Sequence, residues 1–102
     1  MFIRNGGEYI MLTSDQFIQK AKELVLNYVK EHLDKTDNVS ISIDNVYVVW
    51  FTFILGNQKA MLSTTLPDGM YYEITYNSAT DEMYVDAYKK FENQCIHCDL
   101  VD

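Results

Sequence analysis

One stretch constrains the fold more than any other: the ten residues from Val46 to Leu55, which read VYVVWFTFIL. Nine of these ten residues are apolar or aromatic, and Thr52 is the exception. β-Branched and aromatic types dominate the stretch, which predicts a β-strand rather than a helix. A strand with one solvent-exposed face alternates polar and apolar residues, and this stretch does not. We therefore expect an inner strand of a sheet with both of its faces covered.

Length and charge narrow the class of protein. The chain has 102 residues, of which 48% are hydrophobic, enough for one domain with a single core. Its formal net charge of −7 argues against direct nucleic-acid binding, because contacts with phosphates need a basic surface. An acidic protein that occupies a partner's nucleic-acid site stays open. No apolar run reaches the ~20 residues of a membrane span, so we expect no membrane association and a cytoplasmic protein with reduced thiols.

Residues 1–12 show no periodicity and look separate from the domain. The codons for Gly6-Gly7-Glu8 can spell a bacterial ribosome-binding site upstream of Met11, so we expect Met11 to be the natural start. Residues 1–12 would then be a leader or flexible arm, and the alternative is an arm or edge strand of the fold. The predicted organisation is this arm, a single α+β domain over residues 13–98, and a tail at 99–102.

A long helix is predicted from Thr13 to Asp34. Thr13 is a good N-cap, and Gln16 stands where a capping box needs it. Apolar residues recur at intervals of three and four from Phe17 to Leu33, which gives one broad apolar stripe. We expect this stripe to pack on a sheet.

The rest of the chain predicts short strands joined by tight turns. Residues 39–44 suit either a short edge strand or a loop that places apolar side chains in the core. After the stretch 46–55, Gly56-Asn57 signals a hairpin turn. Alternating strands follow at 58–65 and 70–76, and the turn between them, residues 66–69, reads Leu-Pro-Asp-Gly.

A fourth strand at 82–85 is predicted to be short. Asp86 would then cap a second helix, which has Ala87, Tyr88, Phe91 and Cys95 on its apolar side. Short connections make neighbouring strands antiparallel. The predicted fold class is α+β, with a long N-terminal helix packed on a four-stranded antiparallel β-meander, followed by a short C-terminal helix.

The sheet face turned away from the long helix is the predicted interaction face. Two or three exposed aromatic side chains there make a patch of several hundred Å², larger than a monomer normally leaves open. We expect this face to pair with a second copy, giving a homodimer, or to bind a host protein. The alternative is that residues 39–45 and the C-terminal helix cover it. The candidate residues are Tyr47, Trp50, Phe51, Met61, Ser63, Thr65, Tyr71, Glu73 and Thr75.

No catalytic residue, cofactor or metal site is predicted. Cys95, His97 and Cys98 offer three possible metal ligands within four residues, but Cys-x-x-Cys is only half of a zinc site. A thioredoxin-like thiol pair would stand between a strand and a helix of a βαβ unit rather than at the end of the chain. The simpler interpretation is that Cys95 packs and Cys98 belongs to the tail. Glu73 could instead bind a polar ligand, although a solvent-facing strand glutamate is the more ordinary case.

Four segments resemble a family of unknown function: EHLDK at 31–35, DNVYVVW at 44–50, residues 59–77, and YVDAYKKFEN at 84–93. The family consists of small proteins from phages and prophages of low-GC Gram-positive bacteria, and the resemblance covers about residues 11–96. It implies an accessory role in a phage or prophage and supplies no catalytic residues. The Cys-x-x-Cys segment departs from its pattern.

The sequence thus favours a small acidic accessory protein that acts by protein–protein interaction and modulates host processes or host defence. The alternative is a homo-oligomeric protein that binds or sequesters a nucleotide-like ligand, and an enzyme of unknown type comes third.

Overall fold

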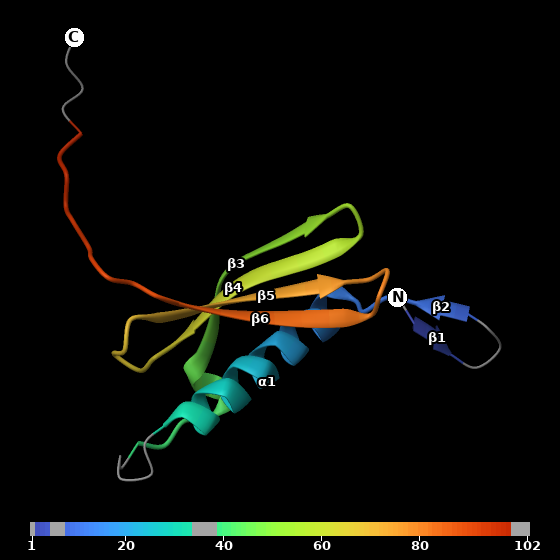
Figure 1. The fold of residues 1–102 in the computed structure, drawn as a ribbon, viewed down its shortest axis with the longest axis horizontal. Coiled ribbons are helices and arrows are strands. Elements are labelled where there is room, and N and C mark those ends of the chain that lie inside the picture. Colours follow the sequence, from blue (N-terminus) through green and yellow to red (C-terminus); the bar gives the residue numbers. More distant parts are fainter. Residues whose placement is uncertain (1, 5–7, 34–38, 99–102) are drawn as a thin grey trace.

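The fold is one helix packed on a four-stranded antiparallel sheet, as Figure 1 shows. A computed structural model describes residues 2–4, 8–33 and 39–98. The strand order is β3-β4-β5-β6, so each strand lies beside the next one in the chain. The elements of this domain are α1 (Ser14–His32), the 3₁₀ turn η2 (Ile43–Asn45), β3 (Val46–Ile54), β4 (Asn57–Thr64), β5 (Met70–Asn77) and β6 (Glu82–Lys89). The predicted α+β class with an antiparallel meander is confirmed.

The N-terminal segment forms a separate hairpin. β1 (Phe2–Arg4) and β2 (Glu8–Ile10) pair with each other, and within the described residues neither joins the four-stranded sheet. The interpretation of residues 1–12 as a leader stays a prediction. Residues 1, 5–7 and 34–38 and the tail at 99–102 lie outside the described residues.

Helix α1 begins at the predicted capping box. The Thr13 Oγ1 accepts a hydrogen bond from the Gln16 N–H at 3.1 Å, and the Gln16 Oε1 accepts one from the Thr13 N–H at 2.9 Å. The buried side chains of the helix are spaced every four residues, which sets the face that meets the sheet: Phe17, Ala21, Val25 and Val29. The helix ends at His32, because Leu33 already has extended backbone angles.

We predict that Thr13→Ala lowers the free energy of unfolding by about 1 kcal/mol, because the Gln16 N–H in the first turn of α1 loses its acceptor, the Thr13 Oγ1. Urea denaturation measures the change. Ser14→Ala at the neighbouring exposed position is the control and is expected to have little effect. Equal stability of Thr13→Ala and wild type would show that the capping box contributes nothing.

The core lies between α1 and one face of the sheet. β4 contributes Ala60 and Leu62, and β5 contributes Tyr72, Ile74 and Tyr76, all buried as the alternation predicts. Ile41 joins them from a segment with no strand, which favours the predicted loop over the predicted edge strand for residues 39–44. Phe17 packs at the centre, with its ring centroid 5.9 Å from Phe51 and 6.5 Å from Tyr76.

The expectation that the apolar stretch is an inner, covered strand is wrong. β3 is an edge strand with β4 as its only neighbour in the described sheet. The reason is topological: tight turns place every strand beside the next, so the first strand of a meander has a single neighbour. Six side chains of β3 remain between 38 and 58% exposed: Tyr47, Val49, Trp50, Phe51, Phe53 and Ile54.

The turn between β3 and β4 lies one residue earlier than predicted. Ile54 pairs with Asn57, so Leu55 and Gly56 form the two-residue loop rather than Gly56 and Asn57. Both loop residues have positive φ, +51° for Leu55 and +79° for Gly56. Such turns favour asparagine and glycine, because a side chain at positive φ meets the backbone. Leu55 is 95% exposed, so no packing offsets this strain.

We predict that Leu55→Asn stabilises the protein by about 0.5–1 kcal/mol, because asparagine adopts positive φ at a lower cost than leucine. Thermal denaturation would show a melting temperature raised by a few degrees. Leu55→Val is the opposite control, since a β-branched side chain makes the strain worse. A lower melting temperature for Leu55→Asn would mean that the leucine side chain contributes contacts.

The predicted C-terminal helix is absent from the described residues. β6 continues to Lys89, and all eight of its residues pair with β5. Asp86 followed by apolar residues at helical spacing is a local signal for a helix. Pairing with β5 outweighs this signal, because the backbone N–H and C=O groups of β5 need hydrogen-bond partners along the whole strand. Residues 90–98 then extend away from the sheet, as Figure 1 shows, and every side chain among them is exposed. From here on, "the arm" means these C-terminal residues 90–98 and not the N-terminal residues 1–12.

Candidate functional site

The sheet face opposite α1 carries side chains from all four strands. Residues that pair directly across an antiparallel sheet point to the same face, so the pairing fixes the membership of this face. We call it the open face. Asn57, Asn77 and Glu82 lie at its end, and the rest of the face consists of Tyr47, Trp50, Thr52, Ile54, Lys59, Met61, Ser63, Tyr71, Glu73, Thr75, Tyr84, Asp86 and Tyr88.

A β-bulge in β3 decides which aromatic side chains reach the open face. Val48 pairs with Leu62 and Trp50 pairs with Met61, so Val49 is an extra residue. The bulge shifts the alternation by one residue, which places both Tyr47 and Trp50 on the open face. It also places Phe51 on the helix side, opposite Ala60. The prediction of Phe51 as an open-face residue is therefore wrong.

An ion pair occupies the middle of the open face. The Lys59 Nζ lies 3.5 Å from the Glu73 Oε1, and the two side chains are partly exposed. Thr52 and Thr75 pair with Lys59 on either side, and Met61 lies opposite Glu73. Because Glu73 already has a cationic partner, it is less suited to gripping a separate polar ligand than the sequence suggested. Surface pairs of this kind contribute little stability, roughly 0–1 kcal/mol.

Aromatic side chains flank this polar centre toward both edges of the sheet. Tyr47 and Trp50 lie on β3, and Tyr84 and Tyr88 lie on β6, the last opposite Tyr71. Tyr84 and Tyr88 were not predicted as site residues, because their segment was assigned in part to a helix. Predicting a strand as far as residue 89 would have placed both tyrosines on this face, because Tyr84, Asp86 and Tyr88 are spaced two residues apart and side chains alternate along a strand.

Two of the predicted residues have structural roles at the end of β4. Ser63 is buried, and its Oγ donates a hydrogen bond to the Met70 carbonyl oxygen at 2.8 Å. Thr65 lies just beyond β4, where its N–H donates to the Asn45 carbonyl oxygen at 3.0 Å. Neither side chain adds to the apolar surface of the open face.

The candidate metal ligands Cys95, His97 and Cys98 all lie in the arm, where both cysteines are free and exposed. The expectation that Cys95 packs is therefore wrong. Among the residues that the structure describes, no three His, Cys, Asp or Glu side chains gather as a metal site. His32 is engaged elsewhere, stacked on Tyr28 with ring centroids 4.0 Å apart.

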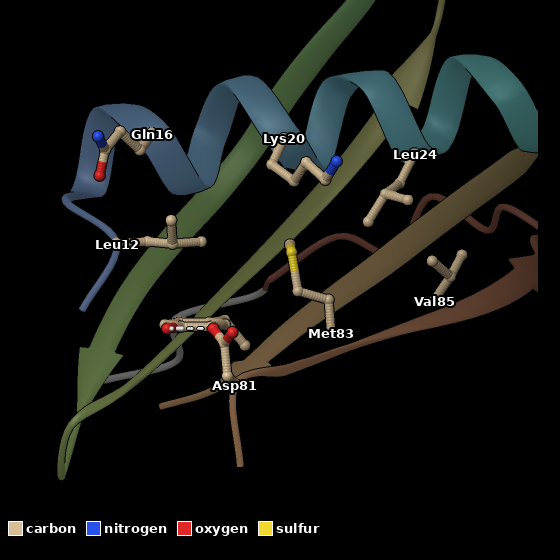
Figure 2. A pocket seen from close by; sticks show the side chains of 8 residues that line it. Leu12, Gln16, Lys20, Leu24, Asp81, Met83 and Val85 are labelled. Carbon is tan, nitrogen blue, oxygen red and sulfur yellow. Dashed lines mark hydrogen bonds between the residues drawn. The ribbon is translucent and has the colours of Figure 1, made fainter. Parts of the chain in front are cut away.

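A groove lies between α1 and β6 on the helix side of the sheet, as Figure 2 shows. Its volume is about 510 Å³, within the range of small-molecule sites. Its walls are mainly apolar, with Lys20 and Asp81 as the charged groups: Leu12, Gln16, Lys20, Leu24, Tyr76, Asp81, Met83 and Val85. The sequence analysis did not predict this groove. The signal was available, because a helix ~10 Å across cannot cover four strands spaced ~4.8 Å apart.

Two buried tyrosines have raised pKa values. Burial raises the pKa of Tyr72 from 10.0 to about 12, and the nearby groups Asp68 and Tyr28 add to this effect. The pKa of Tyr76 is also raised, first by burial and then by its hydrogen bond to Asp81, in which the Tyr76 hydroxyl donates at 3.1 Å. Both residues belong to the buried core, and Tyr76 also lines the groove.

We predict that the protein loses stability between pH 10 and pH 12. The folded state holds the Tyr72 proton more tightly than the unfolded state, so the contribution is complete below pH 10 and declines as the pH rises toward 12. The loss from Tyr72 amounts to roughly 2–3 kcal/mol. Urea denaturation at several pH values measures it, and Tyr72→Phe should flatten the slope. An unchanged slope in Tyr72→Phe would contradict this assignment.

Fold and surface together define a small α+β protein, one helix on a four-stranded antiparallel sheet whose other face is open. The chain belongs to the Family of unknown function (DUF6275), which it matches over residues 18–98. This span includes most of α1, the whole four-stranded sheet and the arm. No curated protein and no solved structure matches the chain. Within the described residues, no helix is both long and apolar enough to cross a membrane.

Proposed function

We propose that this chain is a non-catalytic binding protein whose open face docks a protein partner. The observation that carries the proposal is the amount of exposed aromatic and apolar surface on the open face of the sheet. Tyr47, Trp50, Ile54, Tyr84 and Tyr88 are each 40–58% exposed. At roughly 100 Å² each, they present about 500 Å² of surface in two groups, one on β3 and one on β6, with the Lys59–Glu73 pair between them.

The residue types suit a protein partner. Tyrosine and tryptophan are enriched at binding hot spots, because they bury a large area and lose few rotamers. The Lys59–Glu73 pair in the middle of the face gives a partner donors and acceptors to match. The chain's net charge of −7 favours a partner whose docking surface is neutral or basic, since like charges slow association.

The setting that we propose is the cytoplasm of a bacterial host, where the protein would be a phage or prophage accessory protein. Its support is the resemblance of residues 31–35, 44–50, 59–77 and 84–93 to small phage and prophage proteins. In this proposal the partner is a host protein, and the chain acts as a homodimer that modulates a host process or host defence.

The test is co-purification from a low-GC Gram-positive bacterial lysate with matched variants. Tyr84→Ala combined with Tyr88→Ala removes two open-face rings without touching the core, since both side chains are about half exposed. We expect the variant to lose at least tenfold in affinity for a partner that wild type captures. Gln19→Ala combined with Glu23→Ala, on the exposed side of α1, is the control. Equal capture by all three proteins would refute docking at the open face.

A second candidate function rests on the groove between α1 and β6. We propose as the alternative that this groove holds a small ligand, such as a nucleotide-like molecule. Lys20 offers one cation to an anionic group, and the leucine, valine and methionine walls suit a flat apolar ring. A thermal-shift screen against nucleotides tests it: a reproducible shift that Lys20→Met abolishes supports the ligand function, and a flat screen counts against it.

A further inference from the structure

Strand β3 exposes apolar side chains on both sides of the sheet. On the helix side, Phe51 and Phe53 are 38 and 52% exposed, because α1 does not extend over this edge. On the open face, Trp50 and Ile54 are 40 and 58% exposed. The two pairs point in opposite directions, so a partner lying flat on the open face would leave Phe51 and Phe53 in water. A strand added beside β3 would contact both pairs.

From Trp50 to Ile54, beyond the bulge at Val49, the outer edge of β3 also lacks the features that normally prevent strand addition. Edge strands are usually protected by charged side chains, prolines or short length. β3 has nine residues with no charge and no proline. The opposite edge strand, β6, carries Glu82, Asp86 and Lys89 within its eight residues. The two edges therefore differ: β6 is protected against pairing, and most of β3 is not.

The bulge at Val49 interrupts the first half of β3, and the second half is regular. From Trp50 to Ile54 each residue pairs in sequence with β4. The two-residue turn makes Ile54 and Asn57 a hydrogen-bonded pair, so by alternation Thr52 also directs its N–H and C=O toward β4. The outward-facing backbone groups of this segment consequently belong to Phe51 and Phe53.

We infer that a second copy of the chain adds antiparallel to this edge, segment Trp50–Ile54 against the same segment, with the two-fold axis at Thr52. Phe51 then lies opposite Phe53 of the second copy, and both have free backbone groups for hydrogen bonds. Trp50 lies opposite Ile54 of the second copy on the open side. This register pairs aromatic with aromatic or β-branched side chains, and such cross-strand pairs stabilise sheets. The inference rests on the proposed self-association and names its element and register.

A second copy fits this edge better than an unrelated strand. A two-fold pairing closes on itself, which buries β3 of both copies and leaves the charged β6 strands as the outer edges. In the paired segment, the exposed parts of Trp50, Phe51, Phe53 and Ile54 amount to about 400 Å² per copy, and edge pairing buries the portion that lies along the strand edge. Because this is below the ~800 Å² per partner of a standard interface, the backbone hydrogen bonds of Phe51 and Phe53 carry a large part of the contact. The product is one eight-stranded sheet whose two open faces form a continuous surface.

A disulfide test reads the register directly. In a background with Cys95→Ser and Cys98→Ser, Thr52→Cys places two thiols opposite each other across the two-fold axis. Thr52 is in a non-hydrogen-bonded position there, with Cα atoms ~4.5 Å apart, a spacing that a disulfide can bridge. We expect a cross-linked species of about twice the chain mass of 11.9 kDa on a non-reducing gel. Thr75→Cys, in the middle of the open face, is the control and should not cross-link.

Charged substitutions at Thr52 test the same edge-to-edge contact in solution. Thr52→Lys and Thr52→Glu each place like charges at the axis, so each alone should be monomeric in size-exclusion chromatography with light scattering. Mixed in equal amounts, they should recover the dimer mass, because opposite charges then meet. Tyr84→Lys on the far edge is the control and should stay dimeric. Circular dichroism confirms that each variant remains folded.

The outcomes separate the inference from the broader proposals. A wild type that stays monomeric at high concentration refutes both the edge pairing and the proposed self-association. A dimer that cross-links through Thr75→Cys and not through Thr52→Cys refutes the edge pairing and supports face-to-face association. Partner docking is measured independently with Tyr84→Ala combined with Tyr88→Ala, which lie on β6 at the opposite edge of the sheet.

Discussion

Replacing Phe17 by alanine is expected to lower the free energy of unfolding by about 3–5 kcal/mol. Phe17 is completely buried and lies where three elements meet: its ring contacts Phe51 of β3 and Tyr76 of β5 from its position on α1. The substitution removes the free energy gained by burying the phenyl ring, and it leaves a cavity that the surrounding side chains cannot fill. For a domain of this size, such a loss is a large fraction of the total stability.

The chain supplies a matched control for this experiment. Phe91 lies in the arm and is 96% exposed, so Phe91→Ala makes the same chemical change without affecting the core. Urea denaturation should give a much lower midpoint for Phe17→Ala and an unchanged midpoint for Phe91→Ala. Equal midpoints for the two variants would show that α1 does not pack on the sheet through Phe17.

Local signals predicted the parts of this fold that depend on nearby residues. The capping box at Thr13 and Gln16 is formed by side chains three residues apart, and it is present as expected. The turn at 66–69 is similar, since Asp68 accepts a hydrogen bond from the Met70 N–H at 3.0 Å and Gly69 has a φ of +69°. The alternation in β4 and β5 was readable because one face of each meets the helix and the other does not.

The features that failed prediction depend on non-local competition. The apolar run in β3 is equally compatible with a covered inner strand and with an edge strand whose side chains stay exposed, so the sequence could not distinguish the two. The bulge at Val49 depends on how β3 pairs with Leu62 and Met61, and the residue types near Val49 do not indicate this shift in register. The register places seven of the nine residues predicted for the interaction face on the open face. Phe51 lies on the helix side, and Thr65 lies beyond the paired residues of β4. The binding role of this face stays a prediction.

The extension of β6 beyond Val85 matters most for the proposed function, because it carries Tyr88 onto the open face, and it can be tested with proline. Lys90 donates its N–H to the Gly69 carbonyl oxygen at 2.8 Å. Hydrogen-bonded pairs alternate along an antiparallel ladder, so Asp86, opposite Glu73, directs its N–H toward β5, and Ala87 directs its N–H to solvent.

We therefore expect Asp86→Pro to lower the free energy of unfolding by about 2–3 kcal/mol, because a ladder donor is lost and its acceptor on Glu73 is left without a partner. Ala87→Pro should cost less than about 1 kcal/mol, since proline is tolerated at edge positions whose N–H faces solvent. Urea denaturation of the two variants measures the difference. In a helix starting at Asp86, both prolines would occupy the tolerant first positions. Equal and small effects of the two prolines would therefore support a helix at residues 86–95, and Tyr88 would then not lie on the open face.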